Sequence, residues 1–301
     1  MPDAALDRAG WIGRERLAWR TDGFFAGSRD LPEELPVALS FNRTSHAVMM
    51  ATPADLADFA LGFSLNEGLL DHPGELEELE QVPVRDAEGA LRGIELRCWI
   101  AADRMEALDA RRRHIAGPTG CGLCGLDSLD AALQPPRALP VGRVFSPDQV
   151  QAAVDALRPA QTLNARTRGV HGAGFWTAEE GMVAVREDVG RHNALDKLAG
   201  WLARDGRDPA AGMLVMSSRV SVELVQKAAR MGVPFLTAIS APTSLALQTA
   251  EQAGLTVVAV ARPDGFELHA GPQRVAGADR SRRPASNGLQ APVPVPSGPS
   301  A

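Results

Sequence analysis

Between residues 213 and 262 the sequence alternates short apolar runs with amphipathic stretches. Strands that are buried on both faces of a sheet read as continuous apolar runs, and helices that cross over a sheet join parallel strands. The pattern therefore predicts an α/β fold for the C-terminal half, built from parallel strand–helix–strand units with right-handed crossovers. In chain order the predicted elements are a strand at 213–218, a helix at 221–232, a strand at 233–240, a helix at 242–254 and a strand at 255–262.

Polar side chains follow each of these three predicted strands. Parallel strands end at the same edge of a sheet, and the helix N-termini at that edge present free N–H groups, so ligands collect there. The strand ends thus supply candidate binding residues, which are Ser217, Ser218 and Arg219, then Ser240 and Thr243, then Arg262.

The preceding sequence predicts a mixed set of strands and helices. Residues 35–70 are expected to form strand, turn, strand and helix, with Thr52 as the helix N-cap and Gly68 at its end. Residues 91–101 alternate like a strand, and Cys98 within them is interpreted as a small buried hydrophobe. Further along we expect a helix opened by a capping box at 146–149, a hairpin at 174–188 and a helix at 194–203.

These elements suggest four segments of the chain. Residues 1–30 are an N-terminal extension, and 31–140 are a smaller N-terminal α+β part that contains a cysteine loop at 111–130. Residues 141–276 are the α/β part. The tail, 277–301, is mostly Pro, Gly, Ser and Ala and cannot bury enough apolar surface to order itself.

Composition narrows the class of protein. A hydrophobic fraction of 45% in 301 residues is ample for a buried core, and the net charge of −6 argues against a protein built to coat nucleic acid. The first ten residues carry acids and no apolar core, and no run of eighteen apolar residues occurs. We therefore expect a cytoplasmic protein without membrane or nucleic-acid partners.

Two of the three cysteines lie in the segment TGCGLCG (119–125). Three cysteines are too few for a disulfide framework, which leaves a metal knuckle, a dithiol pair or a nucleophilic thiol. A zinc site lacks a second knuckle, because only Cys98 and His114 are near enough in sequence to complete it. The run Arg111, Arg112 and Arg113 would favour a thiolate, or it is simply a solvated basic turn.

Residues 187–193, EDVGRHN, join the predicted hairpin to the next helix. As a structural feature they are a capped helix start, with Asp188 or Asn193 as the cap and Gly190 in an unusual backbone conformation. As a functional feature, Asp188, Arg191, His192 and Asn193 could bind a polar heterocycle and its phosphates. The sequence of this segment alone supports both interpretations.

Taken in order along residues 35–270, several stretches resemble one family. They are SHAVMMATPADLADFALGFSLNEG (45–68), TGCGLCG (119–125), REDVGRHNALDK (186–197), SSRVSVELVQKAARMG (217–232) and SAPTSLALQTAEQAGLTVVAVAR (240–262). Together they resemble the formate dehydrogenase accessory family FdhD. The resemblance implies a cytidine-deaminase-like α/β fold.

The same resemblance implies a sulfurtransferase. Such a protein takes sulfur as a persulfide from a cysteine desulfurase and passes it to the molybdenum cofactor of formate dehydrogenase. It binds the bis-molybdopterin guanine dinucleotide form as a client rather than a resident cofactor, and it acts as a homodimer. By resemblance Cys121 would carry the persulfide with Cys124 assisting, and the cofactor would contact Val260, Ala261, Arg262, Pro263, Asp264 and Gly265.

Two features depart from the family's pattern. Asp264 adds an acid close to where phosphates are expected, and the tail after Ala276 has no counterpart. Two other classes of function remain open beside the sulfurtransferase. They are a zinc-stabilised, non-enzymatic chaperone for the molybdenum cofactor and a thiol oxidoreductase.

Overall fold

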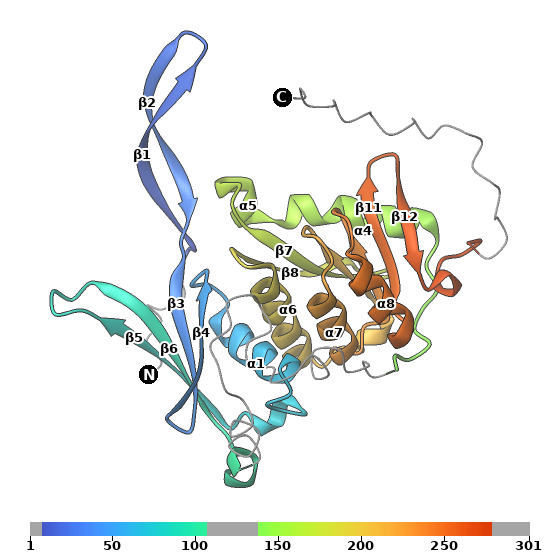
Figure 1. Cartoon of the computed structure of the whole chain (residues 1–301), viewed down its shortest axis with the longest axis horizontal. Coiled ribbons are helices and arrows are strands. Elements are labelled where there is room, and N and C mark those ends of the chain that lie inside the picture. Colours follow the sequence, from blue (N-terminus) through green and yellow to red (C-terminus); the bar gives the residue numbers. More distant parts are fainter. Residues whose placement is uncertain (1–7, 107–137, 279–301) are drawn as a thin grey trace, which may run out of the picture.

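The computed structural model describes residues 8–106 and 138–278 (Figure 1). Its strands are β1 (Trp11–Arg20), β2 (Gly23–Pro32), β3 (Leu35–Phe41), β4 (Thr44–Ala51), β5 (Glu78–Arg85), β6 (Leu91–Trp99), β7 (His171–Thr177), β8 (Gly181–Asp188), β9 (Met213–Met216), β10 (Phe235–Ala238), β11 (Thr256–Arg262) and β12 (Gly265–Ala270). Its α-helices are α1 (Leu56–Asn66), α4 (Pro147–Ala160), α5 (Thr162–Thr167), α6 (Arg191–Asp205), α7 (Val222–Arg230) and α8 (Ser244–Ala253).

The larger sheet lies in the C-terminal half and has the strand order β12-β11-β10-β9-β7-β8. Strands β9, β10 and β11 run parallel, with Leu236 paired to Leu214 and Phe235 to Thr256. The predicted parallel strand–helix–strand units are therefore confirmed. The outer strands are antiparallel to their neighbours, including β12, which the sequence pattern did not predict.

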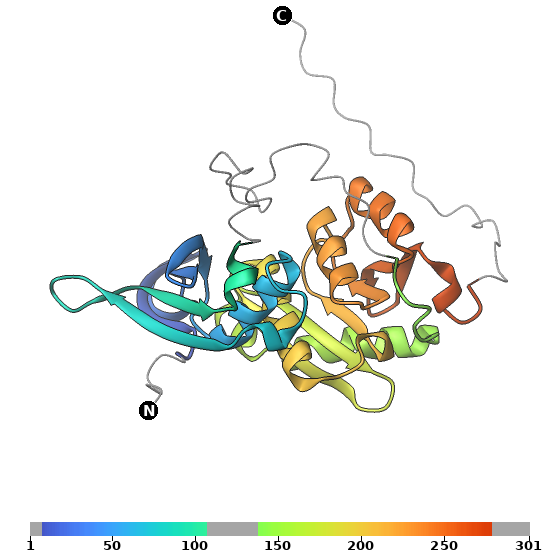
Figure 2. The same ribbon diagram turned by 90° about the horizontal axis from the view of Figure 1, so that it is seen from below.

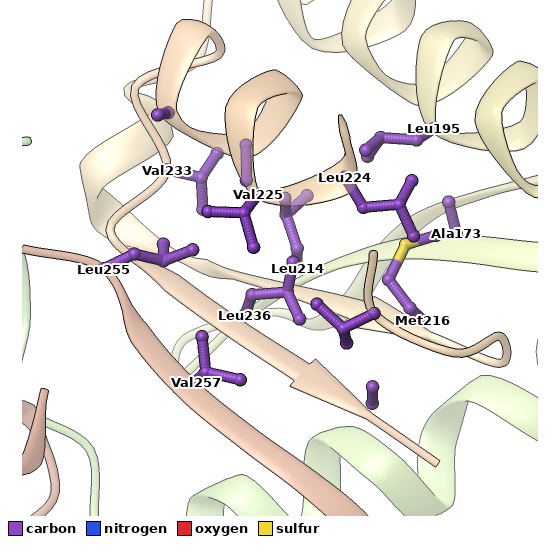
Figure 3. Close-up of a cluster of buried hydrophobic side chains, with 14 of the residues drawn as sticks. Ala173, Leu195, Leu214, Met216, Leu224, Val225, Val233, Leu236, Leu255 and Val257 are labelled. Atoms are coloured by element: carbon purple, nitrogen blue, oxygen red, sulfur yellow. The ribbon is translucent and has the colours of Figure 1, made fainter. Parts of the chain in front are cut away.

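Helices cover both faces of this sheet. Apolar side chains of α6, α7 and α8 and of the strands form one cluster on one face of the sheet. It includes Leu195 and Leu224 from the helices and Leu214, Met216 and Val257 from the strands (Figure 3). On the other face α4 packs through Val150, Ala153 and Leu157 against strand residues such as Val215 and Val258. Figure 2 shows the same layering, with α8 in orange and α4 in green on opposite sides of the strands.

The start of α4 follows its sequence signature. Ser146 accepts a hydrogen bond from the backbone N–H of Gln149, whose side chain accepts one from the N–H of Ser146. Pro147 is the first residue of the helix. Proline has no N–H group, but an N–H at this position would have no hydrogen-bond partner within the helix, so nothing is lost. The predicted capping box is confirmed, and it fixes where α4 begins beside the sheet.

The N-terminal part contains a second sheet with the order β4-β3-β6-β5. Strands β3 and β4 meet in a two-residue turn in which Asn42 and Arg43 both have positive φ, as a tight hairpin requires. Cys98 on β6 is 1% exposed, and burial raises the pKa of its thiol to about 12. It is therefore a buried core residue, as expected.

The two parts of the chain meet where α1 crosses α6 (Figure 1). A Cβ at Gly62 would lie 1.7 Å from the backbone oxygen of Asp196, and one at Gly200 would lie 1.9 Å from that of Asp58. Only glycine permits this approach, because any side chain would overlap the facing backbone. The crossing fixes α1 against the helix that starts at the carboxyl edge of the large sheet.

The segment before α1 differs from the sequence prediction. Thr52 is not the N-cap, because α1 begins at Leu56 after Asp55, which has a left-handed backbone conformation and makes no side-chain cap. Instead the Thr52 hydroxyl accepts a hydrogen bond from the N–H of Val189, and its own N–H donates to Asp188. A tertiary contact has replaced the local cap. Gly68 does follow the end of α1, with φ of 68°.

Strands β1 and β2 form a long hairpin that projects from the molecule (Figure 1). Contacts near its base include the Arg166–Asp30 ion pair and a hydrogen bond from Arg29 to the carbonyl of Thr167. Farther out, Leu17, Trp19 and Phe24 are exposed. Among the helices of the described ranges, none is long and apolar enough to cross a membrane.

Candidate binding site at the carboxyl edge of the large sheet

The polar residues predicted from the strand ends lie along one edge of the large sheet. Strands β9, β10 and β11 end there, and the antiparallel β7 begins there because Ala173 lies opposite Met216. Strand β8 ends beside the start of β7, with Asp188 opposite His171. Helices α6, α7 and α8 start at the same edge, and Figure 1 shows them side by side.

The cysteine loop lies outside the described residues. Cys121 and Cys124, together with the arginines that precede them, fall in the interval 107–137. The C-terminal tail after residue 278 is outside as well. The described part of the expected site is thus the edge of the large sheet.

A cavity of about 580 Å³ opens at this edge, on the α4 side of the sheet. Residues 261–263 and Ile239 line it from the strand ends, and residues 261–263 are among those predicted to contact a cofactor. The rest of its wall comes from α4, α5 and the residue that follows α5, and it comprises Val154, Asp155, Arg158, Pro159, Asn164, Ala165 and Arg168. None of these seven residues was predicted from the sequence as a site residue.

Three arginines line the cavity, which are Arg158, Arg168 and Arg262. Among the described residues none of the three forms an ion pair, whereas Arg166 and Arg186 nearby in sequence each pair with a carboxylate. Arg262 is held in place because its Nη1 donates to the carbonyls of Ile239 at 2.6 Å and Ala261 at 2.8 Å. Three positive charges without acidic partners favour an anion in this cavity.

The backbone of Val260 is unusual. Its φ is 52°, in the left-handed region that a β-branched residue rarely adopts, and the pairing of β11 with β12 shifts register between Ala259 and Arg262. The N–H of Val260 donates to the carbonyl of Ser240 at 3.2 Å. Such strain typically costs about 1–3 kcal/mol and gathers at binding sites, and here it lies directly before the three residues that line the cavity.

Three hydroxyl groups near the ends of β9 and β10, those of Ser217, Ser218 and Thr243, make hydrogen bonds inside the protein. The Ser217 hydroxyl accepts from the N–H of Gly172, and that of Ser218 donates to the carbonyl of Arg219. Thr243 caps α8 by accepting from the N–H of Ala246 at 3.3 Å. These side chains shape the edge, while Arg219 is exposed to solvent.

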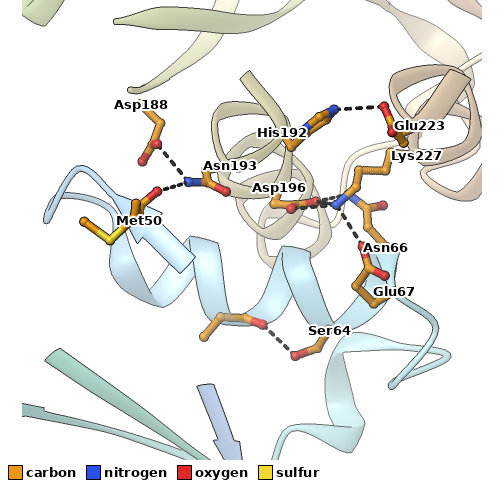
Figure 4. A network of polar contacts seen from close by, with 11 residues as sticks. Met50, Ser64, Asn66, Glu67, Asp188, His192, Asn193, Asp196, Glu223 and Lys227 are labelled. Carbon is orange, nitrogen blue, oxygen red and sulfur yellow. Dashed lines mark hydrogen bonds and ion pairs between the residues drawn. The ribbon is translucent and has the colours of Figure 1, made fainter. Parts of the chain in front are cut away.

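Asp188 is completely buried and forms an ion pair with the equally buried Lys197 at 2.7 Å (Oδ2 to Nζ). It also accepts hydrogen bonds from the N–H groups of Thr52 and Gly190 and from the Asn193 side chain. Figure 4 shows Asn193 between Asp188 and the carbonyl of Met50. Asp188 and Asn193 therefore join the two parts of the chain at the start of α6.

This geometry corrects the predicted helix cap. The N-cap of α6 is Gly190, neither Asp188 nor Asn193, and no side chain caps the helix. Gly190 has an ordinary extended conformation with φ of −102°. The Asp188 carboxylate instead joins the N–H of Thr52, which is distant in the chain, to Gly190, Asn193 and Lys197.

Three side chains of basic type also lie around the start of α6. His171, Arg191 and His192 are all partly buried there, and Arg191 Nε has no hydrogen-bond partner within the described part of the chain. Burial lowers the pKa of His171, and the nearby Arg191 lowers it further. Figure 4 shows His192 directed at Glu223, 3.2 Å away between Nε2 and Oε2. The hydrogen bond from His192 lowers the pKa of Glu223 to about 2.

A second buried network lies deeper between α1, α6 and α7 (Figure 4). Asp196 accepts from Asn66 Nδ2 at 2.8 Å and pairs with Lys227 at 2.7 Å, and Lys227 also pairs with Glu67. These groups bond to one another and hold the helices together. Within residues 8–106 and 138–278 no group of three or more His, Cys, Asp and Glu side chains could hold a metal ion.

The fold and this edge define a mixed α/β protein with an arginine-lined cavity at the carboxyl ends of parallel strands. Residues 32–276 match the model of the FdhD/NarQ family, and the chain belongs to that family. It is 48% identical to a protein of Agrobacterium fabrum over 86% of this chain and 94% of that protein. It is 50% identical to one of Brucella abortus over 84% of this chain and 92% of the other.

Both relatives carry the name sulfur carrier protein FdhD. The fold is also similar to the crystal structure of a proposed formate dehydrogenase accessory protein from Desulfotalea psychrophila, with a TM-score of 0.66 and 23% identity. That similarity covers 88% of this chain and 99% of the other. It confirms the expected fold, and the family match confirms the resemblance seen in the sequence.

Proposed function

We propose that this protein is a sulfur carrier that accepts persulfide sulfur from a cysteine desulfurase and delivers it to the molybdenum cofactor required by formate dehydrogenase. The cavity carries the proposal, because its three unpaired arginines suit the phosphates of a dinucleotide-bearing cofactor. The sulfur-carrier names of relatives that are nearly half identical supply the chemistry.

In the loading step Cys121 is the nucleophile. Its thiolate attacks the outer sulfur of the desulfurase persulfide, forms a new S–S bond and displaces the desulfurase cysteine as a thiolate. One S–S bond breaks and one forms, so the step needs no oxidant or reductant. The proton lost by the Cys121 thiol is available to the leaving thiolate.

In the delivery step Cys124 supplies electrons. The outer sulfur of a persulfide is formally at oxidation state zero, so its release as sulfide requires two electrons. The Cys124 thiolate can attack the inner sulfur, form a disulfide with Cys121 and expel the outer sulfur as sulfide toward the bound cofactor. A cellular dithiol then reduces the disulfide and restores the pair.

The cofactor is a client, and its bis-molybdopterin guanine dinucleotide form would bind at the carboxyl edge. Arg158, Arg168 and Arg262 would hold its phosphates, while Val260 and Gly265 shape the turn that presents residues 261–263. Asp264 is exposed at that turn and does not line the cavity, so it need not oppose the phosphates. In this proposal the exchange takes place in the cytoplasm and in a homodimer.

Sulfur loading is tested by intact mass. After incubation with a cysteine desulfurase and cysteine, the full chain should gain about 32 Da, removable by a thiol reductant. Cys121→Ala should remove the gain, whereas Cys98→Ala, the matched control, should keep it because Cys98 is buried. Wild-type protein that gains no sulfur but holds stoichiometric zinc would instead support the cofactor chaperone. Sulfur gain by Cys121→Ala would contradict the assignment of the nucleophile.

A further inference from the structure

Among residues 8–106 and 138–278, Asp155 of α4 is the one carboxylate that lines the cavity together with Arg158, Arg168 and Arg262. In the part of the chain that the structure describes, Asp155 forms no ion pair with any of them. Its Oδ1 accepts a hydrogen bond from Gln151 Nε2 at 3.0 Å, one turn earlier on α4. The side chain of Asp155 is exposed, so its carboxylate can accept hydrogen bonds from a ligand that enters the cavity.

The chemistry of Asp155 restricts that partner. An ionised carboxylate only accepts hydrogen bonds, and its two oxygens have room for several donors. It repels a phosphate but matches a neutral group with two adjacent N–H donors. The hydrogen bond from Gln151 to Oδ1 orients the carboxylate of Asp155. The second oxygen, Oδ2, remains available to accept hydrogen bonds from a ligand.

The rest of the cavity suits a flat ring. Val154, Pro159, Ile239, Ala261 and Pro263 supply apolar surface between the charged groups. Apolar walls with a few placed polar groups are typical of sites for nucleotides and other small molecules. The arginines could bind a diphosphate, and the apolar surface could pack against a base.

Among the common purines, guanine presents two adjacent donors on its Watson–Crick edge, the ring N1–H and the 2-amino group. Adenine presents an acceptor at N1, which a carboxylate would repel. We propose that Asp155 is a base-specificity residue that binds the N1–H and 2-amino groups of guanine, while Arg158, Arg168 and Arg262 hold the diphosphate of the same nucleotide. This inference rests on the proposed function, because the nucleotide is the guanine dinucleotide end of the cofactor.

The experiment measures nucleotide affinity of the full chain by calorimetry with GDP, ADP and XDP. Xanthine carries a carbonyl where guanine carries the 2-amino group, so an amide side chain suits it better than a carboxylate does. Wild type should bind GDP at least about 10-fold more tightly than ADP or XDP. Asp155→Asn should weaken GDP about 10–100-fold, as for lost hydrogen bonds to a charged group, and should strengthen XDP.

Two kinds of control separate base recognition from general effects. Asp148→Asn removes another exposed acid of α4 that does not line the cavity, and it should change no affinity. Arg158→Ala should weaken GDP, ADP and XDP by the same factor, because the phosphates are common to all three. Both substitutions lie on the exposed surface of α4, where folding does not depend on them.

The proposal is overturned if wild type binds GDP and ADP equally, if it binds no nucleotide, or if Asp155→Asn leaves the ratio of GDP to XDP affinity unchanged. Sulfur loading of Cys121, measured by intact mass on the same proteins, distinguishes failure of this proposal from failure of the proposed function. Intact loading with no base preference rejects the role of Asp155 alone. Absent loading rejects the proposed function whatever the nucleotide result.

Discussion

The crossing of α1 and α6 makes Gly62→Ala the most informative single change for the architecture. A methyl group at Gly62 would lie 1.7 Å from the backbone oxygen of Asp196, whereas ordinary contact begins at 3.4 Å. The two backbones must therefore separate by roughly the difference. Such a shift would also pull Asn66 away from Asp196, whose hydrogen bond spans the same helices at 2.8 Å.

The expected loss follows from three contributions. Overpacking of a well-packed contact costs about 1–3 kcal/mol, and a lost hydrogen bond to a charged group costs about 1.5–3 kcal/mol. The higher helix propensity of alanine than of glycine stabilises the variant by about 1 kcal/mol. The net fall in the free energy of unfolding is about 3 kcal/mol, which corresponds to roughly 6–12 °C in Tm for a protein of this size.

Urea denaturation followed by tryptophan fluorescence measures this loss. Gly27→Ala is the matched control, because a Cβ at Gly27 in the β1–β2 hairpin meets nothing within 4 Å. The control should change stability by less than about 0.5 kcal/mol. If Gly62→Ala were as stable as Gly27→Ala, the helices would not be in backbone contact and the link between the two parts of the chain would need another explanation.

Two further predictions concern ionisable side chains. Because burial raises the pKa of the Cys98 thiol to about 12, the double variant Cys121→Ala/Cys124→Ala should react with a thiol reagent at pH 8 only after denaturation, and rapid labelling of the native protein would refute this. The hydrogen bond from His192 lowers the pKa of Glu223 from 4.5 to about 2, so its contribution to stability is full above pH 4.5 and is lost as the pH falls toward 2. Glu223→Gln should therefore lose less free energy of unfolding than wild type between about pH 4.5 and pH 2, as measured by urea denaturation. An equal loss in the two proteins over this range would contradict the role of this contact.

Local pattern predicted much of the secondary structure. The strands and helices between residues 213 and 262, the capping box at Ser146 and the hairpin of β7 and β8 were all expected, because periodicity and capping act within a few neighbouring residues. The same local rules failed at Thr52 and Gly190. Both belong to the network around Asp188, whose partners lie more than a hundred residues apart in sequence.

The sequence by itself determined the family, the parallel strands and the cysteine pair, since motifs and hydrophobic period are properties of the linear chain. It also located the strand ends, including Arg262, because parallel strands must end at one edge. Only the tertiary structure decided which residues of other elements lie next to these strand ends. Asp155, Arg158 and Arg168 join Arg262 in one cavity because α4 packs on that face of the sheet and α5 follows α4 directly. The packing depends on long-range contacts of apolar surfaces, and no local pattern in α4 or α5 specifies which strand end they will meet.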